Sequence, residues 1–468
     1  MLCGGPMQRK VPLLWFCLYK CCVAQCETAG QEGSEQCATQ DVPEADDTSM
    51  LQPLASKERI HANFQHLMPS WYTKARSHSK AVLSTDELHF SKPDGVPIPS
   101  SGCATWTPGS GTNEAVKMKV DVTFPMLGTT VREYRIVVPK TVGVGEHTGP
   151  APLLISFHGQ FGSAYQQETG WADYNGYNKL AEANGYISVF PEGMQDFIPS
   201  KVEIDGIPSN NGQAYMGTGW NVGAGGSAKT CWQGINGTNV IDLPPTKYSC
   251  YESCQKLRQC SRCNWSTCHS DVGFVRAMLT QITDQYCVDL SRLYLTGVSD
   301  GAMMQHHISQ VMPETFAAYN PIFGLPLLGF QNGGDAQFIR NPNPLRESAI
   351  LELHSRSDKT IPFLGGMASS KYRNWYYTPL ETILKDWAAV HGCRVETVNV
   401  TDLPFSPGDG DFECFEHPHC TSGKRVIGCL YGPANQQQDT HGEAPWGFRG
   451  GKSAFWFYSH FRRSNPTW

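Results

Sequence analysis

Arg292-Leu293-Tyr294-Leu295-Thr296-Gly297-Val298-Ser299-Asp300-Gly301 is an apolar run that stops at a serine between two glycines. This pattern predicts a strand, a sharp turn and the start of a helix, with the serine hydroxyl at the apex of the turn. A glycine two positions away on either side removes the side chains that would clash where strand and helix come close. The pentapeptide 297–301 is short and the chain has 46 Gly, so an ordinary surface loop could also contain it by chance. The surrounding sequence has to decide between the two interpretations.

Apolar runs and helical patterns alternate on both sides of this stretch. Residues 152–157 form a continuous apolar run, which is typical of a strand buried on both faces of a parallel sheet. The expected elements are a hairpin at 116–138, strands at 152–157, 186–190, 293–296, 348–353, 395–400 and 426–430, and helices at 177–184 (ended by Gly185), 271–286 (capped by Ser270), 302–312, from Thr378-Pro379 to Gly392, and 452–461. Their order predicts an α/β fold with a doubly wound, mainly parallel sheet and helices on both faces.

Composition divides the chain into four expected parts. Residues 1–24 have the pattern of a secretory signal, because two basic residues precede an apolar run and a small-residue cleavage site, although Lys20 interrupts that run. Residues 25–100 are expected to be an acidic linker or pro-segment, partly disordered. Residues 101–468 are expected to be the main folded domain, with a cysteine-rich insertion at 225–270. No other run approaches the roughly 20 apolar residues that a membrane-spanning helix needs, so a soluble mature protein with no membrane partner is expected.

Charge and cysteine content narrow the partners and the compartment. The formal net charge of -6 argues against a broad basic surface that would bind nucleic acid. Four of the 18 Cys precede residue 25 and would leave with the signal, and 18 minus 4 gives 14, an even number that allows complete pairing. Three glycosylation sequons begin at Asn236, Asn264 and Asn399. These features together predict a secreted, extracellular glycoprotein with disulfide bonds.

The insertion interrupts the alternation of strands and helices. Its cysteines are Cys231, Cys250, Cys254, Cys260, Cys263 and Cys268. The Cys260-Ser261-Arg262-Cys263 pair could belong to a zinc knuckle, but an even number of cysteines in a secreted chain favours disulfides. We therefore expect a disulfide-stapled flap beside the active site and no metal.

A nucleophilic serine needs a histidine that takes its proton and a carboxylate that orients the histidine. In a doubly wound hydrolase these partners follow in the order serine, acid, histidine, on loops at the carboxyl ends of later strands. The expected strand at 348–353 leads into His354-Ser355-Arg356-Ser357-Asp358, which places Asp358 on such a loop. Other downstream candidates lie in a polar, glycine-rich loop, where a solvated turn explains them; they are Asp402, Asp409 and Asp411.

Five histidines follow Asp358, namely His391, His417, His419, His441 and His460. A helix dipole explains His391 at a helix C-terminus. The two at 417 and 419 lie between Cys414 and Cys420, in an expected disulfide loop, and His460 lies within the expected last helix. His441 follows a strand by a loop and precedes the closing helix, so it is the predicted base, with His419 as the alternative.

A tetrahedral intermediate also needs two N–H donors that point at its oxyanion. The backbone of Asp300, the residue after the nucleophile, is expected to supply one. The turn His158-Gly159-Gln160 follows the strand at 152–157, and the Gln160 N–H is the predicted second donor. The alternative is a plain turn between strand and helix at His158.

With these residues assembled, the chain resembles the secreted esterases of the feruloyl esterase and polyhydroxybutyrate depolymerase group of α/β-hydrolases. The resemblance covers about residues 101–461. The motifs that carry it are Leu154 to Gly159 with Gly162, Gly170-Trp171 through Phe190-Pro191-Glu192-Gly193, Gly219-Trp220-Asn221-Val222-Gly223, Asp271-Val272-Gly273-Phe274-Val275, Gly297-Val298-Ser299-Asp300-Gly301, Asp358-Lys359-Thr360-Ile361-Pro362 and Gly365-Gly366.

The resemblance implies that Ser299 is the nucleophile, Asp358 the acid and His441 the base. Trp220, within one of the motifs, and Trp446 are candidate substrate-binding residues, with simple packing as the alternative for Trp446. The chain also departs from the family pattern. Ala302 stands where many members have a second glycine, Thr440-His441-Gly442 lacks the common Gly-Gly-His-x-Trp-Pro form, and the cysteine-rich insertion is additional.

The sequence therefore predicts a secreted serine carboxylesterase that works through an acyl-enzyme and needs no cofactor. The resemblance favours hydroxycinnamoyl (feruloyl) esters linked to plant polysaccharide. A polymeric substrate such as polyhydroxybutyrate, or acetylated xylan, is the alternative. A binding protein without activity on the same fold is an alternative of another class, since fold alone does not fix function. A disulfide-stapled structural protein is disfavoured, because it gives no reason for the pattern around Ser299.

Overall fold

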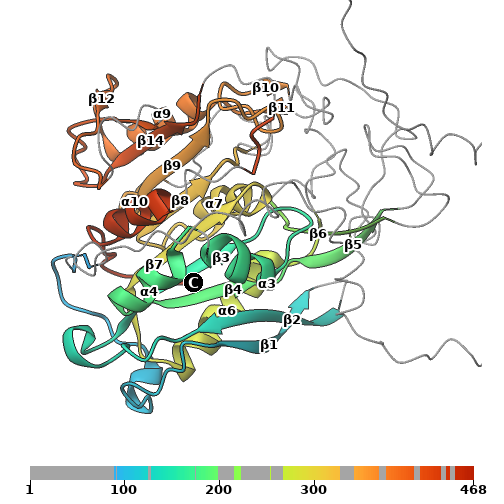
Figure 1. The fold of residues 1–468 in the computed structure, drawn as a ribbon, viewed down its shortest axis with the longest axis vertical. Coiled ribbons are helices and arrows are strands. Elements are labelled where there is room, and N and C mark those ends of the chain that lie inside the picture. The colour runs from blue at the N-terminus through green and yellow to red at the C-terminus, as the bar shows by residue number, and fades with distance from the viewer. Residues whose placement is uncertain are drawn as a thin grey trace, which may run out of the picture. The chain divides into compact units, whose positions relative to one another are not determined.

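The computed structural model describes residues 89–90, 92–124, 128–173, 175–198, 215–222, 253, 267–326, 342–367, 376–404, 412–433, 439–442 and 448–468 (Figure 1). The strands are β1 (Ala115–Phe124), β2 (Gly128–Val137), β3 (Ala151–Phe157), β4 (Ile187–Pro191), β5 (Met194–Ile198), β6 (Tyr215–Gly219), β7 (Val288–Val298), β8 (Ala318–Ile322), β9 (Ala349–Ser355), β10 (Gly366–Met367), β11 (Tyr376–Tyr377), β12 (Val398–Asn399), β13 (Phe412–Glu416) and β14 (Val426–Tyr431). The helices are η3 (Ser101–Ala104), η4 (Gly145–His147), α3 (Ala164–Gln166), η5 (Gln167–Ala172), α4 (Tyr177–Asn184), α6 (Asp271–Gln285), α7 (Asp300–Val311), α8 (Pro342–Leu345), α9 (Leu380–His391) and α10 (Phe448–Tyr458).

A ten-stranded sheet is the centre of this fold, in the order β1-β2-β4-β3-β7-β8-β9-β14-β13-β12. The central strands β4-β3-β7-β8-β9-β14 run parallel to one another. Antiparallel strands flank them at both ends, β2 and β1 on one side and β13 and β12 on the other. All residues of β3 and β9 are buried, as expected for strands covered on both faces. The predicted doubly wound, mainly parallel sheet is confirmed, and the topology is that of the α/β-hydrolase fold.

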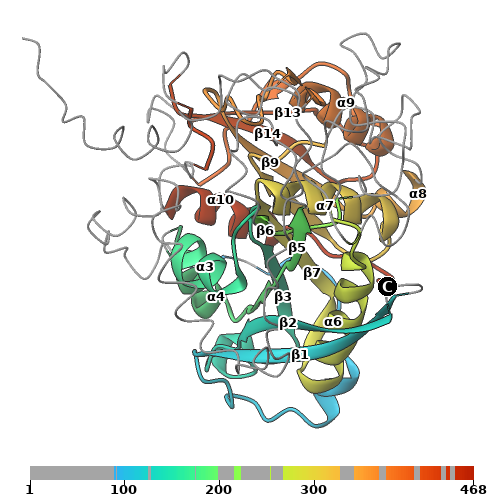
Figure 2. The same ribbon diagram turned by 90° about the vertical axis from the view of Figure 1, so that its right-hand side faces the viewer.

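Helices cover both faces of the sheet, as Figure 2 shows from the side. Phe274 of α6, Met304 of α7 and Trp387 of α9 belong to one apolar core. Leu180 of α4 and Phe455 of α10 belong to a second core on the opposite face. Two cores separated by one sheet follow directly from the order of strands and helices along the chain.

Several predicted elements are confirmed with close boundaries. The hairpin pairs Ala115 with Val137 and Phe124 with Gly128. Helix α4 ends at Asn184, and Gly185 follows in the left-handed conformation with φ of 66°, which glycine adopts without steric cost. Gly392 ends α9 in the same way, with φ of 60°.

Other predictions were wrong in detail. Strands β8 and β13 were not predicted; β8 contains Pro321, which lacks the N–H that a central strand normally uses. The strand expected at 395–400 is only Val398–Asn399. Ser270 precedes α6 but its side chain makes no capping bond. Pro379 occupies the N-cap of α9, so that helix begins one residue later than expected.

The last helix runs from Phe448 to Tyr458 instead of 452–461, so His460 lies beyond it. Gly450 and Gly451 lower the intrinsic helix propensity of its first turn. Both are buried, and α10 packs against α4, so tertiary contacts override that propensity.

Disulfides join Cys103 to Cys287, Cys393 to Cys420 and Cys414 to Cys429. The prediction of a disulfide loop closed by Cys414 and Cys420 was therefore wrong, because these two cysteines bond to different partners. Cys414 lies directly opposite Cys429 in the antiparallel β13–β14 pair, which explains this pairing. Cys268 is also disulfide-bonded.

The described fold begins before the expected boundary at residue 101. Pro99 forms an antiparallel bridge with Asp289, and Ser100 N–H donates to the Val288 carbonyl at 2.9 Å. Asn399, in the third sequon, is exposed on the edge strand β12. The signal, most of the linker, the other two sequons and the cysteines other than Cys268 in the insertion lie outside the described residues. Among the helices that the structure describes, none is both long and apolar enough to cross a bilayer.

Candidate active site

The parallel register brings the ends of five strands to one edge of the sheet. Phe157 lies beside Gly297, and Val298 beside Ile322. Ser355, the last residue of β9, lies beside Tyr431, the last residue of β14. Loops that leave the carboxyl ends of parallel strands therefore meet here, where ligands bind in open α/β sheets. These loops carry the residues predicted at 160, 299, 358 and 441.

Ser299 forms the turn between β7 and α7. Its backbone has φ of 54° and ψ of -121°, a conformation that costs a side-chain-bearing residue energy and that recurs at functional sites. The Ser299 N–H donates to the Ile322 carbonyl at 3.0 Å, and the Ser299 carbonyl accepts from Met303 N–H at 3.0 Å. A Cβ on Gly301 would lie 2.5 Å from the His158 carbonyl oxygen, so that close approach requires glycine. The strained turn predicted from the sequence is present.

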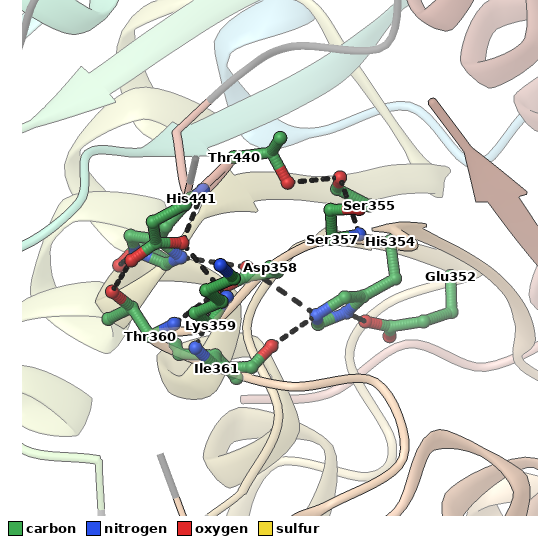
Figure 3. Close-up of polar contacts among 12 residues, drawn as sticks. Glu352, His354, Ser355, Ser357, Asp358, Lys359, Thr360, Ile361, Thr440 and His441 are labelled. Carbon is green, nitrogen blue, oxygen red and sulfur yellow. Dashed lines mark hydrogen bonds and ion pairs between the residues drawn. The ribbon is translucent and has the colours of Figure 1, made fainter. Parts of the chain in front are cut away.

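A chain of two hydrogen bonds joins the three predicted catalytic side chains. Ser299 Oγ lies 2.9 Å from His441 Nε2. His441 Nδ1 lies 2.8 Å from Asp358 Oδ2, and Figure 3 shows these two residues. Because a carboxylate only accepts, Nδ1 carries the proton and Nε2 presents a lone pair to the serine hydroxyl. The exposed fractions are 8% for Ser299 and 4% for Asp358. This is the geometry that proton transfer from serine to histidine requires.

The turn after β9 fixes the second oxygen of Asp358. Asp358 Oδ1 accepts from the N–H of Thr360 at 3.0 Å and of Ile361 at 2.7 Å. The carboxylate therefore has one oxygen held by the backbone and one facing His441. Both oxygens are committed, so the side chain cannot rotate without losing hydrogen bonds.

Asp439 is a site residue that sequence reasoning missed. Its Oδ1 accepts from the backbone N–H of His441 at 3.0 Å and of Lys359 at 2.8 Å. Its Oδ2 accepts from the Thr360 hydroxyl at 2.7 Å. Asp439 thus ties the loop of the histidine to the loop of Asp358. A carboxylate two residues before the predicted base was the only available signal.

The surroundings of His441 raise its pKa above the ordinary value of 6.5. Burial works against the charged ring, but the carboxylate of Asp358, and further that of Asp439, outweigh burial. Phe323, which follows β8 with φ of 40°, packs its ring edge-on against the imidazole at 5.4 Å between centroids. The site therefore stabilises the imidazolium that His441 becomes when it takes a proton, and Phe323 holds the ring from the side. No sequence pattern indicated Phe323.

The predicted oxyanion donors lie beside the serine, in the turn after β3 and in the first turn of α7. A Cβ on Gly159, next to Gln160, would lie 3.2 Å from Ser299 Cβ. The Asp300 carboxyl is completely buried, and its Oδ2 accepts from Trp220 N–H at 2.9 Å. Burial, and further the charge of Asp271, raise the pKa of Asp300 well above its ordinary value, against the opposing effect of the hydrogen bond from Trp220. The oxyanion role of Gln160 and Asp300 stays a prediction.

The two tryptophans have different outcomes. Trp220 has no exposed surface, and its indole N–H donates to the His158 carbonyl at 2.8 Å. Its ring packs edge-on against Phe157 at 5.1 Å between centroids. A fully buried ring of this kind supports the turn beneath the site, so the expected substrate contact is corrected to a packing role. Trp446 lies outside the described residues.

The other histidines have structural explanations. Burial, and then Lys424, lower the pKa of His391 to about 4, so a charge–dipole interaction does not explain it; its Nδ1 lies 2.9 Å from Ser422 Oγ. His417 is buried and its Nδ1 donates to the Arg394 carbonyl at 3.1 Å. It is His441, and not the alternative at 419, that the structure brings to the serine. Within the described ranges, no group of three or more His, Cys, Asp or Glu side chains is arranged to hold a metal ion.

Ala302, one of the departures from the pattern of the resembled family, is completely buried. Its methyl group faces Gly324, on which a Cβ would lie only 2.6 Å from Ala302 Cβ and 2.1 Å from the Ser299 carbonyl oxygen. The missing side chain at 324 therefore makes room for the alanine. This departure from the family pattern leaves the turn at Ser299 intact.

Comparison with known proteins agrees with this geometry. The chain is 24% identical over 300 residues to feruloyl esterase B of Piromyces equi, a match that covers 64% of this chain and 41% of that protein. It is 22% identical over 307 residues to acetylxylan esterase A of Aspergillus oryzae, covering 62% of this chain and 76% of the relative. The chain has homologues among feruloyl and acetylxylan esterases. The match thus spans only about two fifths of the length of feruloyl esterase B.

No protein-family model matches the chain. Among solved structures, an acetyl xylan esterase from Aspergillus awamori is similar at 16% identity with a TM-score of 0.37, covering 74% of this chain and 99% of the other.

Proposed function

We propose that this protein is a serine carboxylesterase that hydrolyses esters through an acyl-enzyme. The observation that carries the proposal is the continuous line from Ser299 Oγ through His441 to Asp358, with contacts of 2.9 Å and 2.8 Å. Nucleophilic attack on a carbonyl needs a serine in an exposed, strained turn, a neutral imidazole with a free lone pair, and a carboxylate that is held in place. Similarity to esterases supports the same reaction class.

In the first half of the reaction, Ser299 Oγ attacks the ester carbonyl carbon while His441 Nε2 takes the hydroxyl proton. The carbonyl π electrons move to the oxygen, and the backbone N–H groups of Gln160 and Asp300 are proposed to stabilise that oxyanion. Asp358 stabilises the imidazolium that forms. Collapse of the tetrahedral intermediate breaks the C–O bond, and His441 gives its proton to the departing alkoxide.

In the second half, water attacks the acyl group on Ser299 while His441 again accepts a proton. A second tetrahedral intermediate forms and collapses, which releases the carboxylic acid and returns the proton to Ser299 Oγ. The residues named above account for each proton transfer, so the proposal invokes no cofactor.

Among substrates, we propose feruloyl (hydroxycinnamoyl) esters of plant polysaccharide first and acetyl esters of xylan second. Names of homologues support both classes. The two substrate classes differ in the acyl group. An aromatic acyl group needs a long apolar pocket, whereas an acetyl group needs almost none. The polyester alternative stays an expectation from the sequence resemblance alone.

A substrate panel tests reaction and specificity together. Initial rates with methyl ferulate, acetylated xylan and a hydroxybutyrate oligomer are measured for wild type and Ser299→Ala. We expect hydrolysis of methyl ferulate by wild type and a loss of at least about 10³-fold in Ser299→Ala. Faster release of acetate than of ferulate would overturn the first substrate class in favour of the second.

Labelling with a fluorophosphonate separates an enzyme from a binding protein without activity on the same fold. Reaction at phosphorus leaves the probe on Ser299 Oγ and expels fluoride. We expect the labelled peptide to contain Ser299 and the Ser299→Ala variant to stay unlabelled. Absence of labelling and of hydrolysis in wild type would favour the binding protein.

We further propose that the protein is secreted. The three described disulfides and that of Cys268 are compatible with an oxidising compartment. N-terminal sequencing of the protein from culture medium should begin at residue 25. Retention of the whole protein inside cells would contradict secretion.

A further inference from the structure

A second cluster of ionisable side chains lies directly behind Asp358. Glu352 and His354 stand two residues apart on β9, so they share one face of the strand. Both have no exposed surface, and His306 of α7, which faces Glu352, is 2% exposed. Buried groups of this kind are costly unless they are paired. The mechanism proposed above uses none of them, so their presence calls for an explanation.

His354 holds the same turn that holds the acid. His354 Nε2 lies 2.6 Å from the Ile361 carbonyl oxygen and 3.6 Å from Asp358 Oδ2 (Figure 3). A carbonyl oxygen only accepts, so Nε2 carries the proton. Ile361 in turn donates its N–H to Asp358 Oδ1 at 2.7 Å. Ile361 is therefore held at its carbonyl by His354 and at its N–H by the carboxylate of Asp358.

The other ring nitrogen of His354 faces Glu352. Nδ1 lies 4.0 Å from Glu352 Oε1, and Glu352 Oε2 lies 3.3 Å from His306 Nε2. Burial lowers the pKa of His306 to about 3, so His306 is neutral. Burial also raises the pKa of Glu352 to about 7, against an opposing effect of His354. Glu352 therefore changes between its neutral and its ionised form near neutral pH.

The ionisable groups that face this pair, among the described residues, are His306 on α7 and Asp358 in the loop after β9. Beyond Asp358 lies His441, which also contacts Asp439. With its proton in place, Glu352 is neutral. Loss of the proton leaves one negative charge behind Asp358, on the side opposite His441.

We propose that Glu352 and His354 are positioning residues for the triad: His354 holds the turn of Asp358, and the Glu352 carboxylate places a negative charge behind that turn. The proposal rests on the esterase function proposed above. The added charge stabilises the imidazolium form of His441, because opposite charges favour each other's ionised state. The pair thereby ties the basicity of His441 to the ionisation of Glu352.

Glu352→Gln tests the electrostatic part, since it keeps the shape and cannot ionise. We expect the acid limb of kcat/KM to move to lower pH by about half a unit, with KM unchanged because the pair does not touch substrate. His391→Gln is the matched control, a buried histidine of α9 that is not in contact with the triad, and its pH profile should overlay wild type. Glu352→Met is the second variant if the first does not fold.

His354→Phe tests the positioning part, and His354→Gln is its conservative counterpart. The phenyl ring removes the donor to Ile361, so kcat should fall at least about tenfold. An amide at this position can keep that donor, so His354→Gln should recover most of kcat. Equal kcat in wild type and His354→Phe would overturn the positioning role.

A titration of the His441 imidazole by NMR separates this inference from the esterase proposal, because it needs no turnover. We expect a lower midpoint for His441 in Glu352→Gln than in wild type. If the same shift is found in a protein that hydrolyses no ester, the coupling of Glu352 to His441 stands and the proposed esterase function is overturned. An unchanged His441 midpoint in an active esterase would overturn the charge coupling.

Discussion

Replacing Asp358 by asparagine keeps the shape of the side chain but should nearly abolish hydrolysis. In the native site, Oδ1 accepts from the N–H groups of Thr360 and Ile361, at 3.0 Å and 2.7 Å. In Asp358→Asn only the amide oxygen can accept these bonds. The amide NH₂ must then occupy the position of Oδ2, which lies 2.8 Å from His441 Nδ1.

This orientation forces the wrong tautomer on His441. An NH₂ group donates, so Nδ1 has to accept and the imidazole proton moves to Nε2, which faces Ser299 at 2.9 Å. A protonated Nε2 cannot take the serine proton, and the charge that stabilises the imidazolium is also gone. The corresponding change in a serine-protease triad lowers kcat by about 10⁴, or about 5 kcal/mol of transition-state stabilisation. We expect a similar loss in kcat, with KM changed little.

The assay is steady-state hydrolysis of the best ester in the panel by wild type, Asp358→Asn, Ser299→Ala and a control. Asp402→Asn is the control because Asp402 is an exposed partner of Arg425, and it should stay within about twofold of wild type. Melting temperatures establish that each variant is folded. If Asp358→Asn keeps activity within tenfold of wild type while Ser299→Ala is inactive, the backbone hydrogen bonds do not fix the amide in the orientation that forces the wrong tautomer on His441.

Three further outcomes follow from the structure. The acid limb of kcat/KM should have its midpoint above 6.5, because the pKa of His441 is raised, and Asp439→Asn should move that midpoint to lower pH in a rate–pH profile. The pKa of Glu352 rises from 4.5 unfolded to about 7 folded, so its contribution to stability is present below 4.5 and is lost as pH rises to about 7. Glu352→Gln should therefore gain stability relative to wild type across that window, by up to roughly 3 kcal/mol in denaturant melts. Replacing Cys103 and Cys287 by serine opens a link between residues 184 apart and should cost at most about 5 kcal/mol by the same measurement.

The parts of the fold that sequence predicted well are those where local chemistry and burial agree. Helix α4 has a glycine at its end that adopts φ of 66°, and its boundaries were predicted correctly. Strand β8 was missed because Asn320 and Pro321 argue against a central strand. There the Asn320 side chain donates to the Leu351 carbonyl at 2.7 Å and accepts from the Tyr177 hydroxyl at 2.9 Å. Those partners lie far along the chain, so no local pattern could indicate them.

The same distinction holds in the site. Chain order and the strand before each loop were enough to select Ser299, Asp358 and His441, because the carboxyl ends of parallel strands meet at one edge. Asp439 and Phe323 were not found, since their roles depend on which loops lie side by side. The role of Trp220 was predicted wrongly for a related reason. The sequence of its motif does not show whether the tryptophan ring is buried or exposed.

The sequence by itself therefore determined most of the order of strands and helices, the strained turn at Ser299 and three residues, Ser299, Asp358 and His441, that the structure joins by hydrogen bonds. Tertiary structure alone decided the disulfide pairing, the burial of Trp220 and the pair of Glu352 and His354 behind Asp358. The sequence alone shows periodicity, turn residues and chain order, because these are properties of residues that are close along the chain. Desolvation, charge coupling and the direction of a side chain depend on groups that only folding brings together.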